Sequence, residues 1–215
     1  MWRIVKDSVY QYIENLIPGR PEFFMRMENY ASEHHIPIME STGIEAMLQI
    51  LRIKNPKKIL EVGAAIGYSS LRMAYALPHT KIITIERDEE RAFLARKNIM
   101  ELGMEEQVTL VIGDALEMVD EASSYGPFDV IFIDAAKGQY QRFFELYSRY
   151  LLEDGLIITD NVLFKGLVAE EVIQHKRTAQ LVKKIKQYNE WLMSHSDYHT
   201  VILPVGDGVA ISKKG

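Results

Sequence analysis

Residues 59–70 read Ile59-Leu60-Glu61-Val62-Gly63-Ala64-Ala65-Ile66-Gly67-Tyr68-Ser69-Ser70, and this is the most informative stretch of the chain. An apolar segment ends in a glutamate, a glycine turn follows, and hydroxyl side chains then stand where a helix begins. The two glycines let the backbone approach a ligand closely, and the first turn of a helix exposes unpaired N–H groups. The stretch therefore predicts a strand, a tight loop and a helix that together hold a nucleotide-like cofactor.

The glycine spacing in this loop separates two kinds of cofactor. It reads G-x-x-x-G, whereas the dinucleotide fingerprint reads G-x-G-x-x-G. A cofactor that ends in an amino acid needs a carboxylate for its ammonium group and hydroxyls for its carboxylate, and Glu61 and Ser69 supply such groups. The loop therefore favours S-adenosylmethionine over NAD. An NAD-dependent oxidoreductase, a cofactor-binding module without catalysis and an ordinary turn between strand and helix are the alternatives.

Composition limits the class of protein. The chain has 215 residues, of which 47% are hydrophobic, and this length suits one domain over residues 1–215. The absence of cysteine excludes disulfides and thiolate metal sites and is typical of a reducing cytosol. A net charge of −5 argues against a general polyanion binder. No apolar run reaches the length of a membrane span, so we predict a soluble, cytoplasmic protein with no membrane partner.

Two patterns of apolar residues divide the chain. Up to residue 52 they recur at helical spacing, which predicts a helical cap over residues 1–52. From residue 57 onward short apolar runs alternate with helical segments, which predicts a doubly wound α/β core over residues 57–215. The last two apolar runs flank Gly206-Asp207-Gly208 and predict an antiparallel hairpin. The expected fold is a mostly parallel, seven-stranded, Rossmann-like sheet with a C-terminal antiparallel hairpin.

The expected elements follow from these patterns. Cap helices are expected over 6–17, from 22 onward and over 40–52. Strands are expected over 57–62, 81–86, 107–112, 128–133, 156–160, 200–204 and 209–212. Helices of the core are expected over 68–77, 88–103, 114–122, 139–151 and 167–194.

Acidic residues close the second and third predicted strands. Ligands of doubly wound sheets bind at the carboxyl ends of the strands, so these residues are candidate contacts. Glu86 has the position of a carboxylate that bridges two ribose hydroxyls. Asp114, after Gly113, has the position of an acceptor for the adenine amino group. Either acid alone could instead cap a helix, but together they outline a site for an adenosine cofactor.

Oxygen-bearing side chains close the next two strands. Asp134 follows the run 128–133, and Asp160-Asn161 end the run 156–160. Two carboxylates and an amide oxygen, without sulfur or histidine, suit Mg²⁺ and leave positions open for two adjacent substrate oxygens. Lys137 lies in the loop after Asp134, and a lysine beside a divalent cation shifts toward its neutral form and can take a hydroxyl proton. The pattern predicts methyl transfer to oxygen, although each residue alone could be a helix cap or a solvated side chain.

Combined, these motifs resemble a known family. They are Leu60-Glu61-Val62-Gly63 with Gly67-Tyr68-Ser69, Ile85-Glu86, Gly113-Asp114-Ala115, the run 128–137 and Asp160-Asn161-Val162-Leu163. The chain is similar, over roughly residues 37–215, to the cation-dependent class I O-methyltransferases that include the catechol and caffeoyl-CoA O-methyltransferases. The resemblance implies Mg²⁺ on Asp134, Asp160 and Asn161, with Lys137 as the general base. The residues expected to contact S-adenosylmethionine are Met39, Glu61, Gly63, Ser69, Glu86, Gly113, Asp114 and Asp134.

Two departures from the family concern the acceptor. The chain has Asp134-Ala135-Ala136-Lys137 where plant members carry Asp-Ala-Asp-Lys, and Phe164-Lys165-Gly166 where a tryptophan is common. A plant-like acyl-CoA acceptor is therefore not expected. Within the family the chain most resembles the bacterial enzymes that methylate 5-hydroxyuridine at the tRNA wobble position, which implies the tRNA anticodon loop as substrate. A small catechol-like acceptor is the alternative.

Two further expectations concern partners. The predicted helix around 176–192 carries a basic face that could meet RNA phosphates or could be an ordinary solvated surface. The residues of this face are Lys176, Arg177, Lys183, Lys184 and Lys186. The apolar faces of the N-terminal helices, together with the resemblance, predict a homodimer.

Overall fold

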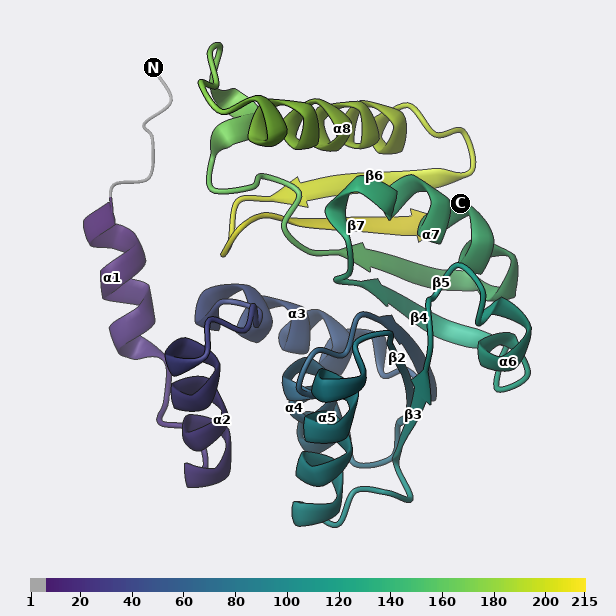
Figure 1. Ribbon diagram of the computed structural model, residues 1–215. Helices are drawn as coiled ribbons and strands as arrows, with labels where there is room; N and C mark the ends of the chain where they lie inside the picture. Colours follow the sequence, from purple (N-terminus) through teal and green to yellow (C-terminus); the bar gives the residue numbers. More distant parts are fainter. Residues whose placement is uncertain (1–6) are drawn as a thin grey trace.

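Seven strands form one mixed sheet in the computed structural model of the chain, which describes residues 7–215 (Figure 1). The strands are β1 (Lys58–Val62), β2 (Lys81–Glu86), β3 (Val108–Ile112), β4 (Phe128–Ile133), β5 (Leu151–Thr159), β6 (Tyr198–Leu203) and β7 (Val209–Lys214). Their order is β3-β2-β1-β4-β5-β7-β6; the first five are parallel, and β7 runs antiparallel to both β5 and β6. The predicted Rossmann-like sheet with its terminal hairpin is confirmed.

Helices cover both faces of the sheet. They are α4 (Tyr68–Ala76), α5 (Glu89–Glu101), α6 (Val119–Ser123), α7 (Tyr140–Tyr147) and α8 (Lys176–Met193). Alternate strand residues point to opposite faces, and in β4 Phe132 packs against the core under α4 and α5 while Ile131 packs against the core under α6, α7 and α8. Because both faces are buried, the parallel strands are nearly continuous apolar runs.

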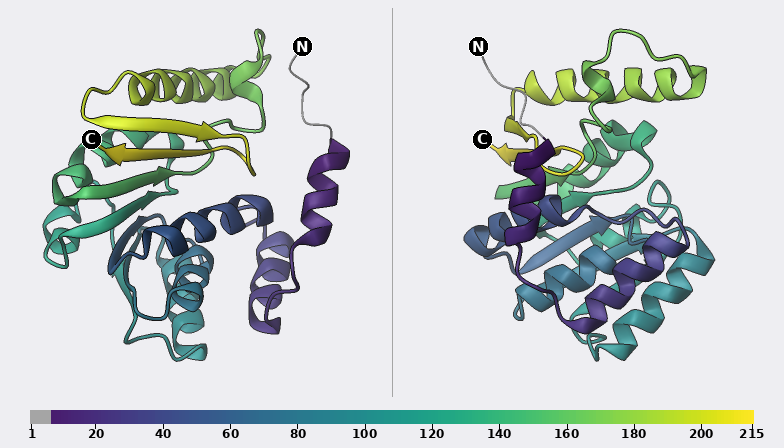
Figure 2. Two further views of the ribbon diagram at one scale, coloured as in Figure 1. Left: turned by 180° about the vertical axis from the view of Figure 1, so that it is seen from behind. Right: turned by 90° about the vertical axis from the view of Figure 1, so that its left-hand side faces the viewer.

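Three helices precede the sheet. They are α1 (Asp7–Leu16), α2 (Glu22–Glu33) and α3 (Ser41–Lys54), and Figure 2 shows α1 standing away from the sheet. The hydroxyl of Tyr10 on α1 donates to the carbonyl oxygen of Pro204 at 2.5 Å. Glu28 on α2 accepts a hydrogen bond of 2.5 Å from Tyr68 at the start of α4. The predicted cap therefore contacts the core at α4 and just after β6. Its residues 1–6 lie outside the described residues.

Three expected helices are shorter than predicted. The segment 114–122 is helical only in α6, because the Asp114 carboxylate accepts the Leu116 N–H and holds a turn there. The helix expected over 139–151 is α-helical only to Tyr147 and continues as a 3₁₀ turn, Ser148–Tyr150, before Leu151 pairs with β4. The helix expected over 167–194 begins at Lys176. Before it, left-handed residues at 164–166 interrupt the helical path and leave only a short 3₁₀ turn at Leu167–Ala169.

Among residues 7–215, no helix is long and apolar enough to cross a membrane.

Candidate active site

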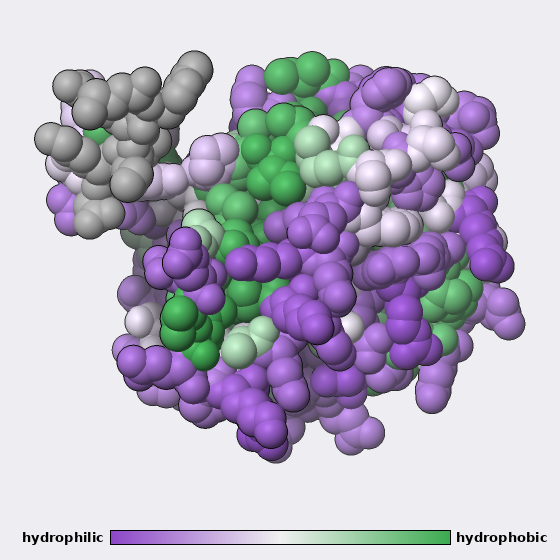
Figure 3. Space-filling model, turned by 90° about the horizontal axis from the view of Figure 1, so that it is seen from above, coloured by the Kyte–Doolittle hydropathy of each residue, from purple (hydrophilic) through white to green (hydrophobic). Residues whose placement is uncertain are grey.

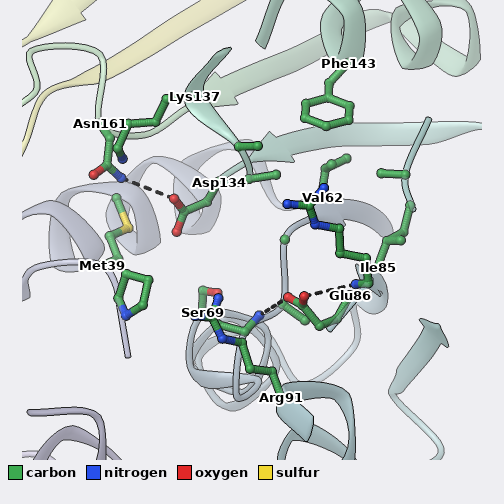
Figure 4. Close-up of a pocket in the computed structure, with 18 of the residues that line it drawn as sticks. Met39, Val62, Ser69, Ile85, Glu86, Arg91, Asp134, Lys137, Phe143 and Asn161 are labelled. Carbon is green, nitrogen blue, oxygen red and sulfur yellow. Dashed lines mark hydrogen bonds between the residues drawn. The ribbon is translucent and has the colours of Figure 1, made fainter. Parts of the chain in front are cut away.

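A cavity of about 530 Å³ opens at the carboxyl ends of the parallel strands (Figure 4). The loops after β1, β2, β3 and β4 form most of its wall, and the segment 37–39 before α3 closes one side. Nine of the predicted site residues line it: Met39, Gly63, Ser69, Glu86, Gly113, Asp114, Asp134, Lys137 and Asn161. Glu61 and Asp160 lie outside its lining.

Gly63 brings two of these loops together. Its φ is 103°, and a Cβ added there would lie 2.3 Å from the carbonyl oxygen of Asp134. No other residue fits, since L side chains avoid this backbone conformation and the contact is with backbone. The glycine of the opening motif therefore sets the distance between the β1 loop and the loop that carries Lys137.

Glu61 lies behind the wall of the cavity. Its carboxylate is fully buried and accepts hydrogen bonds from the hydroxyls of Ser69 and Thr84. Burial raises the pKa of Glu61 to about 7, although these two hydrogen bonds act in the opposite direction. Ser69 stands between this carboxylate and the cavity, so the direct contact of Glu61 with a cofactor ammonium stays a prediction.

Backbone N–H groups fix the carboxylate of Glu86. It accepts hydrogen bonds from Ala65 at 2.7 Å, Asp88 at 2.9 Å and Arg87 at 3.0 Å. The carboxylate therefore has a defined place at the end of β2, where a ribose would be held.

Two arginines at the same end of the cavity were not predicted from the sequence. Arg87 and Arg91 line the cavity, and the Arg87 guanidinium lies 3.5 Å from the Asp114 carboxylate. The sequence position of Arg87 could have indicated that it lines the site, because it directly follows Glu86 at the end of a strand. Asp114 itself accepts the Leu116 N–H at 2.9 Å, so one of its oxygens is used in a local turn.

Two of the predicted metal ligands, Asp134 and Asn161, line the opposite end of the cavity, and the third, Asp160, is hydrogen-bonded to Asn161. The Asn161 amide nitrogen donates to Asp160 at 2.7 Å and to Asp134 at 3.2 Å, and Figure 4 shows Asn161, Asp134 and Lys137 gathered there. Burial and the charge of Asp160 raise the pKa of Asp134 well above its ordinary value. Burial likewise raises the pKa of Asp160. A cation bound between the two carboxylates would therefore stabilise their charged forms.

The donor set fits a hard divalent cation. Adjacent ligands of octahedral Mg²⁺ lie about 2.9 Å apart, since each is about 2.05 Å from the ion. The spacings around Asn161 are close to this value, and half a turn of its amide would present oxygen instead of nitrogen. Within residues 7–215 no group of three or more acidic, histidine or cysteine side chains could hold a metal. The candidate site therefore consists of two carboxylates and one amide.

Lys137 stands beside these acids on a short 3₁₀ turn, Lys137–Gln139. Burial lowers its pKa, while the negative charges of Asp134, Asp160 and Asp207 raise it. Its ammonium nitrogen lies 5.7 Å from the ring centroid of Phe164. The contact with Phe164 and the proximity of Asp207 were not predicted, because both depend on how separate loops meet.

The chain is similar to known proteins along nearly its whole length. A family model described as O-methyltransferase matches residues 20–215. A catechol O-methyltransferase of Niastella koreensis is 33% identical over 216 residues, which cover 96% of this chain and 96% of that protein. Caffeoyl-CoA O-methyltransferase 2 of Populus trichocarpa is 27% identical, with 97% of this chain and 89% of that protein covered.

A solved structure is also similar to this chain. It is that of a Staphylococcus aureus protein with the provisional name caffeoyl-CoA O-methyltransferase, and it superposes with a TM-score of 0.88 at 36% identity. The superposition covers 97% of this chain and 98% of that one.

Proposed function

The chain belongs to the O-methyltransferase family, whose class I members use S-adenosylmethionine, and from this premise we propose its acceptor and its metal. We propose a Mg²⁺-dependent enzyme that methylates the 5-hydroxyl of 5-hydroxyuridine at the tRNA wobble position and so forms 5-methoxyuridine. A tRNA substrate implies a cytoplasmic location, which is part of the proposal.

One observation carries the proposed chemistry. A single cavity holds the glycine loop and Glu86 at one end and Asp134, Asn161 and Lys137 at the other. The first end suits an adenosine cofactor and the second suits a chelated hydroxyl. Methyl transfer needs these two groups in line and close together, and alignment of this kind is a large part of what an enzyme contributes.

The residues of the chain have distinct tasks in this proposal. Asp134, Asp160 and Asn161 would hold Mg²⁺, which when bound supplies positive charge that lowers the pKa of an acceptor hydroxyl. Lys137 takes the hydroxyl proton on its Nζ, and burial favours the neutral lysine that this step requires. The acceptor oxygen then attacks the methyl carbon of the sulfonium, and the electron pair of the broken bond stays on sulfur.

The position of α8 supports an RNA acceptor. A Cβ added at Gly138 would lie 3.5 Å from the Lys184 Nζ, so this lysine stands over the loop that carries Lys137. Lys176, Arg177 and Lys183 are exposed on the same helix and could contact phosphates beyond the cavity. In 5-hydroxyuridine, O5 lies beside the O4 carbonyl, a vicinal oxygen pair that chelates a divalent ion as a catechol does.

A small catechol-like molecule is the second candidate acceptor. It has the same oxygen pair, and the relative from Niastella koreensis is named for such a reaction. The metal end of the cavity serves either acceptor equally, so the proposed preference for tRNA depends on α8 and on the resemblance to the tRNA-modifying enzymes.

The nucleosides of cellular tRNA test the proposed acceptor. Deletion of the gene in a host that makes 5-methoxyuridine should remove this nucleoside and leave 5-hydroxyuridine, as measured by mass spectrometry of digested tRNA. Unchanged 5-methoxyuridine would contradict the tRNA proposal. Purified protein should then be compared on hydroxylated tRNA and on catechol, and turnover of catechol alone would establish the alternative.

A further inference from the structure

The turn between β6 and β7 reaches across to the loop that follows β5. Asp207 and Gly208 on this turn accept three backbone hydrogen bonds from that loop. The Leu163 N–H donates to the Asp207 carbonyl at 2.9 Å, and the Val162 N–H donates to the Gly208 carbonyl at 3.0 Å. The Lys165 N–H donates to the Asp207 carboxylate. The sequence indicated only a glycine-rich hairpin turn here.

The loop that Asp207 holds has an unfavourable backbone conformation. Phe164 and Lys165 are consecutive non-glycine residues with φ of 44° and 55°. L residues rarely adopt this left-handed region, and such residues persist only where the surrounding structure fixes them. Within residues 7–215, the Asp207 carboxylate is the group that accepts the N–H of Lys165, in the middle of this left-handed segment.

Close packing adds to these hydrogen bonds. A Cβ added at Gly208 would lie 2.3 Å from Cγ of Leu163 and 2.8 Å from its backbone nitrogen. The turn can therefore approach the loop only because residue 208 is glycine, whose φ is 89°. The turn and the loop together form one small packed unit.

This unit sets the acceptor side of the cavity. The loop begins at Asn161, whose amide contacts both metal-site carboxylates, and it carries the Phe164 ring to 5.7 Å from the Lys137 nitrogen. Most of the cofactor side is built from other loops, after β1, β2 and β3, and the turn itself reaches only the start of α3, where Gly206 packs against Gly43. A change at Asp207 should therefore disturb the acceptor side and leave the cofactor side in place.

We propose that Asp207 is a positioning residue for the acceptor, which holds the loop 161–166 so that Phe164 and Asn161 face Lys137. The acceptor role of this loop rests on the proposed methyl transfer. The fixed conformation of the loop does not depend on that proposal. Asp207 acts through hydrogen bonds to the loop and does not touch the reacting atoms.

Three variants separate this role from a general effect on folding. Asp207→Ala removes the carboxylate, Asp207→Asn keeps an oxygen that can accept the Lys165 N–H, and Asp207→Glu shifts the carboxylate by one methylene. Asp197→Ala, in the turn before β6, is the matched control. The measurements are amide hydrogen exchange over residues 161–169, affinity for S-adenosylhomocysteine by calorimetry, and the kcat and KM for hydroxylated tRNA and for catechol.

For Asp207→Ala we expect about tenfold faster exchange at residues 163 and 165 and about a tenfold higher KM for the acceptor. Affinity for S-adenosylhomocysteine should change less than twofold, and Asp207→Asn and Asp197→Ala should resemble the wild type. Should Asp207→Ala fail to fold, Asp207→Glu should show the same pattern more weakly.

Several results would overturn the proposal. They are unchanged exchange and KM in Asp207→Ala, an equal loss of cofactor affinity, or an Asp207→Asn variant as impaired as Asp207→Ala. A wild-type protein that methylates neither acceptor would refute the proposed function. In that case the exchange and calorimetry measurements still decide whether Asp207 fixes the loop.

Discussion

Lys137 is the side chain on which the proposed proton transfer depends. Its pKa is lowered by burial, and it stands beside the two carboxylates of the proposed metal site. We expect Lys137→Met to lower kcat by at least about 100-fold, the usual contribution of a positioned general base. Binding of S-adenosylhomocysteine, measured by calorimetry, should remain within twofold, because methionine fills a similar volume.

Lys57→Met is a matched control for this variant. Lys57 is exposed at the opposite end of β1, so its replacement should leave kcat unchanged. If Lys137→Met kept its kcat within threefold of the wild type, Lys137 would not be the base.

Asp160 permits a test of the metal that does not compromise the fold. Its main-chain groups bond to Ile133 at 3.1 Å and to the Tyr140 hydroxyl at 2.9 Å, and alanine keeps both bonds. We therefore expect Asp160→Ala to fold, with an unchanged circular dichroism spectrum, and to lose the activity that added Mg²⁺ stimulates.

The assay should be run across a Mg²⁺ series and in chelator. Asp154→Ala, on the strand that Asp160 follows, is the control, since Asp154 pairs with Lys54 at the surface. Full turnover of Asp160→Ala in the presence of chelator would exclude the metal role of this residue.

Strand β1 carries a buried carboxylate whose protonation affects stability. The pKa of Glu61 is raised by burial from 4.5 to about 7. The folded state thus binds the proton more tightly than the unfolded state. The contribution of Glu61 protonation to the free energy of unfolding is therefore full below pH 4.5 and is lost as the pH rises through 7. At 1.36 kcal/mol per pKa unit the loss is about 3 kcal/mol.

Glu61→Gln should remove this pH dependence, because glutamine stays neutral and can bond to both Ser69 and Thr84. Its advantage over the wild type in urea unfolding should grow by about 2.5 kcal/mol between pH 5 and pH 8. Titration of Asp160 occurs in both proteins and cancels in the difference, while Asp134 differs only through the Glu61 charge, which contributes to its raised pKa in the wild type. The exposed Glu105→Gln is the control, and a Glu61→Gln advantage independent of pH would contradict the assignment.

The parallel strands were largely predictable from the sequence, although β5 begins at Leu151, five residues before the predicted start at 156. Apolar runs such as Val130-Ile131-Phe132-Ile133 are buried on both faces, so periodicity and length located β4 at Phe128–Ile133 as expected. Helix ends were less predictable because tertiary contacts set them. Helix α7, for example, changes into a 3₁₀ turn at Ser148 before Leu151 pairs with β4.

The same distinction applies to the candidate site. Asp134 and Asn161 could be located from the rule that ligands bind at strand ends, since parallel strands bring their carboxyl ends to one edge. Phe164 and Asp207 could not, because the left-handed backbone at 164–165 is fixed by a turn more than 40 residues away in the chain.

The sequence motifs of the candidate site predict little about the outer surface of the whole molecule. Figure 3 shows hydrophobic residues gathered in a strip on the face seen from above, among hydrophilic neighbours. A second apolar surface lies on α1, where Val9, Tyr12, Ile13 and Leu16 recur at helical spacing and are 43%, 64%, 45% and 62% exposed. Exposed apolar patches of this kind are typical of interfaces between proteins.

We predict that the α1 surface joins two copies of the chain in a homodimer. Light scattering after size exclusion should give twice the mass of one chain at micromolar concentration. Tyr12→Glu with Leu16→Glu should give a monomer with unchanged helix content, because charges at these positions oppose burial at an interface but meet water in a single chain. Phe93→Glu, on α5 and 69% exposed, should remain dimeric and controls for charge alone. A monomeric wild type, or a double variant that still dimerises, would show that α1 is not the interface.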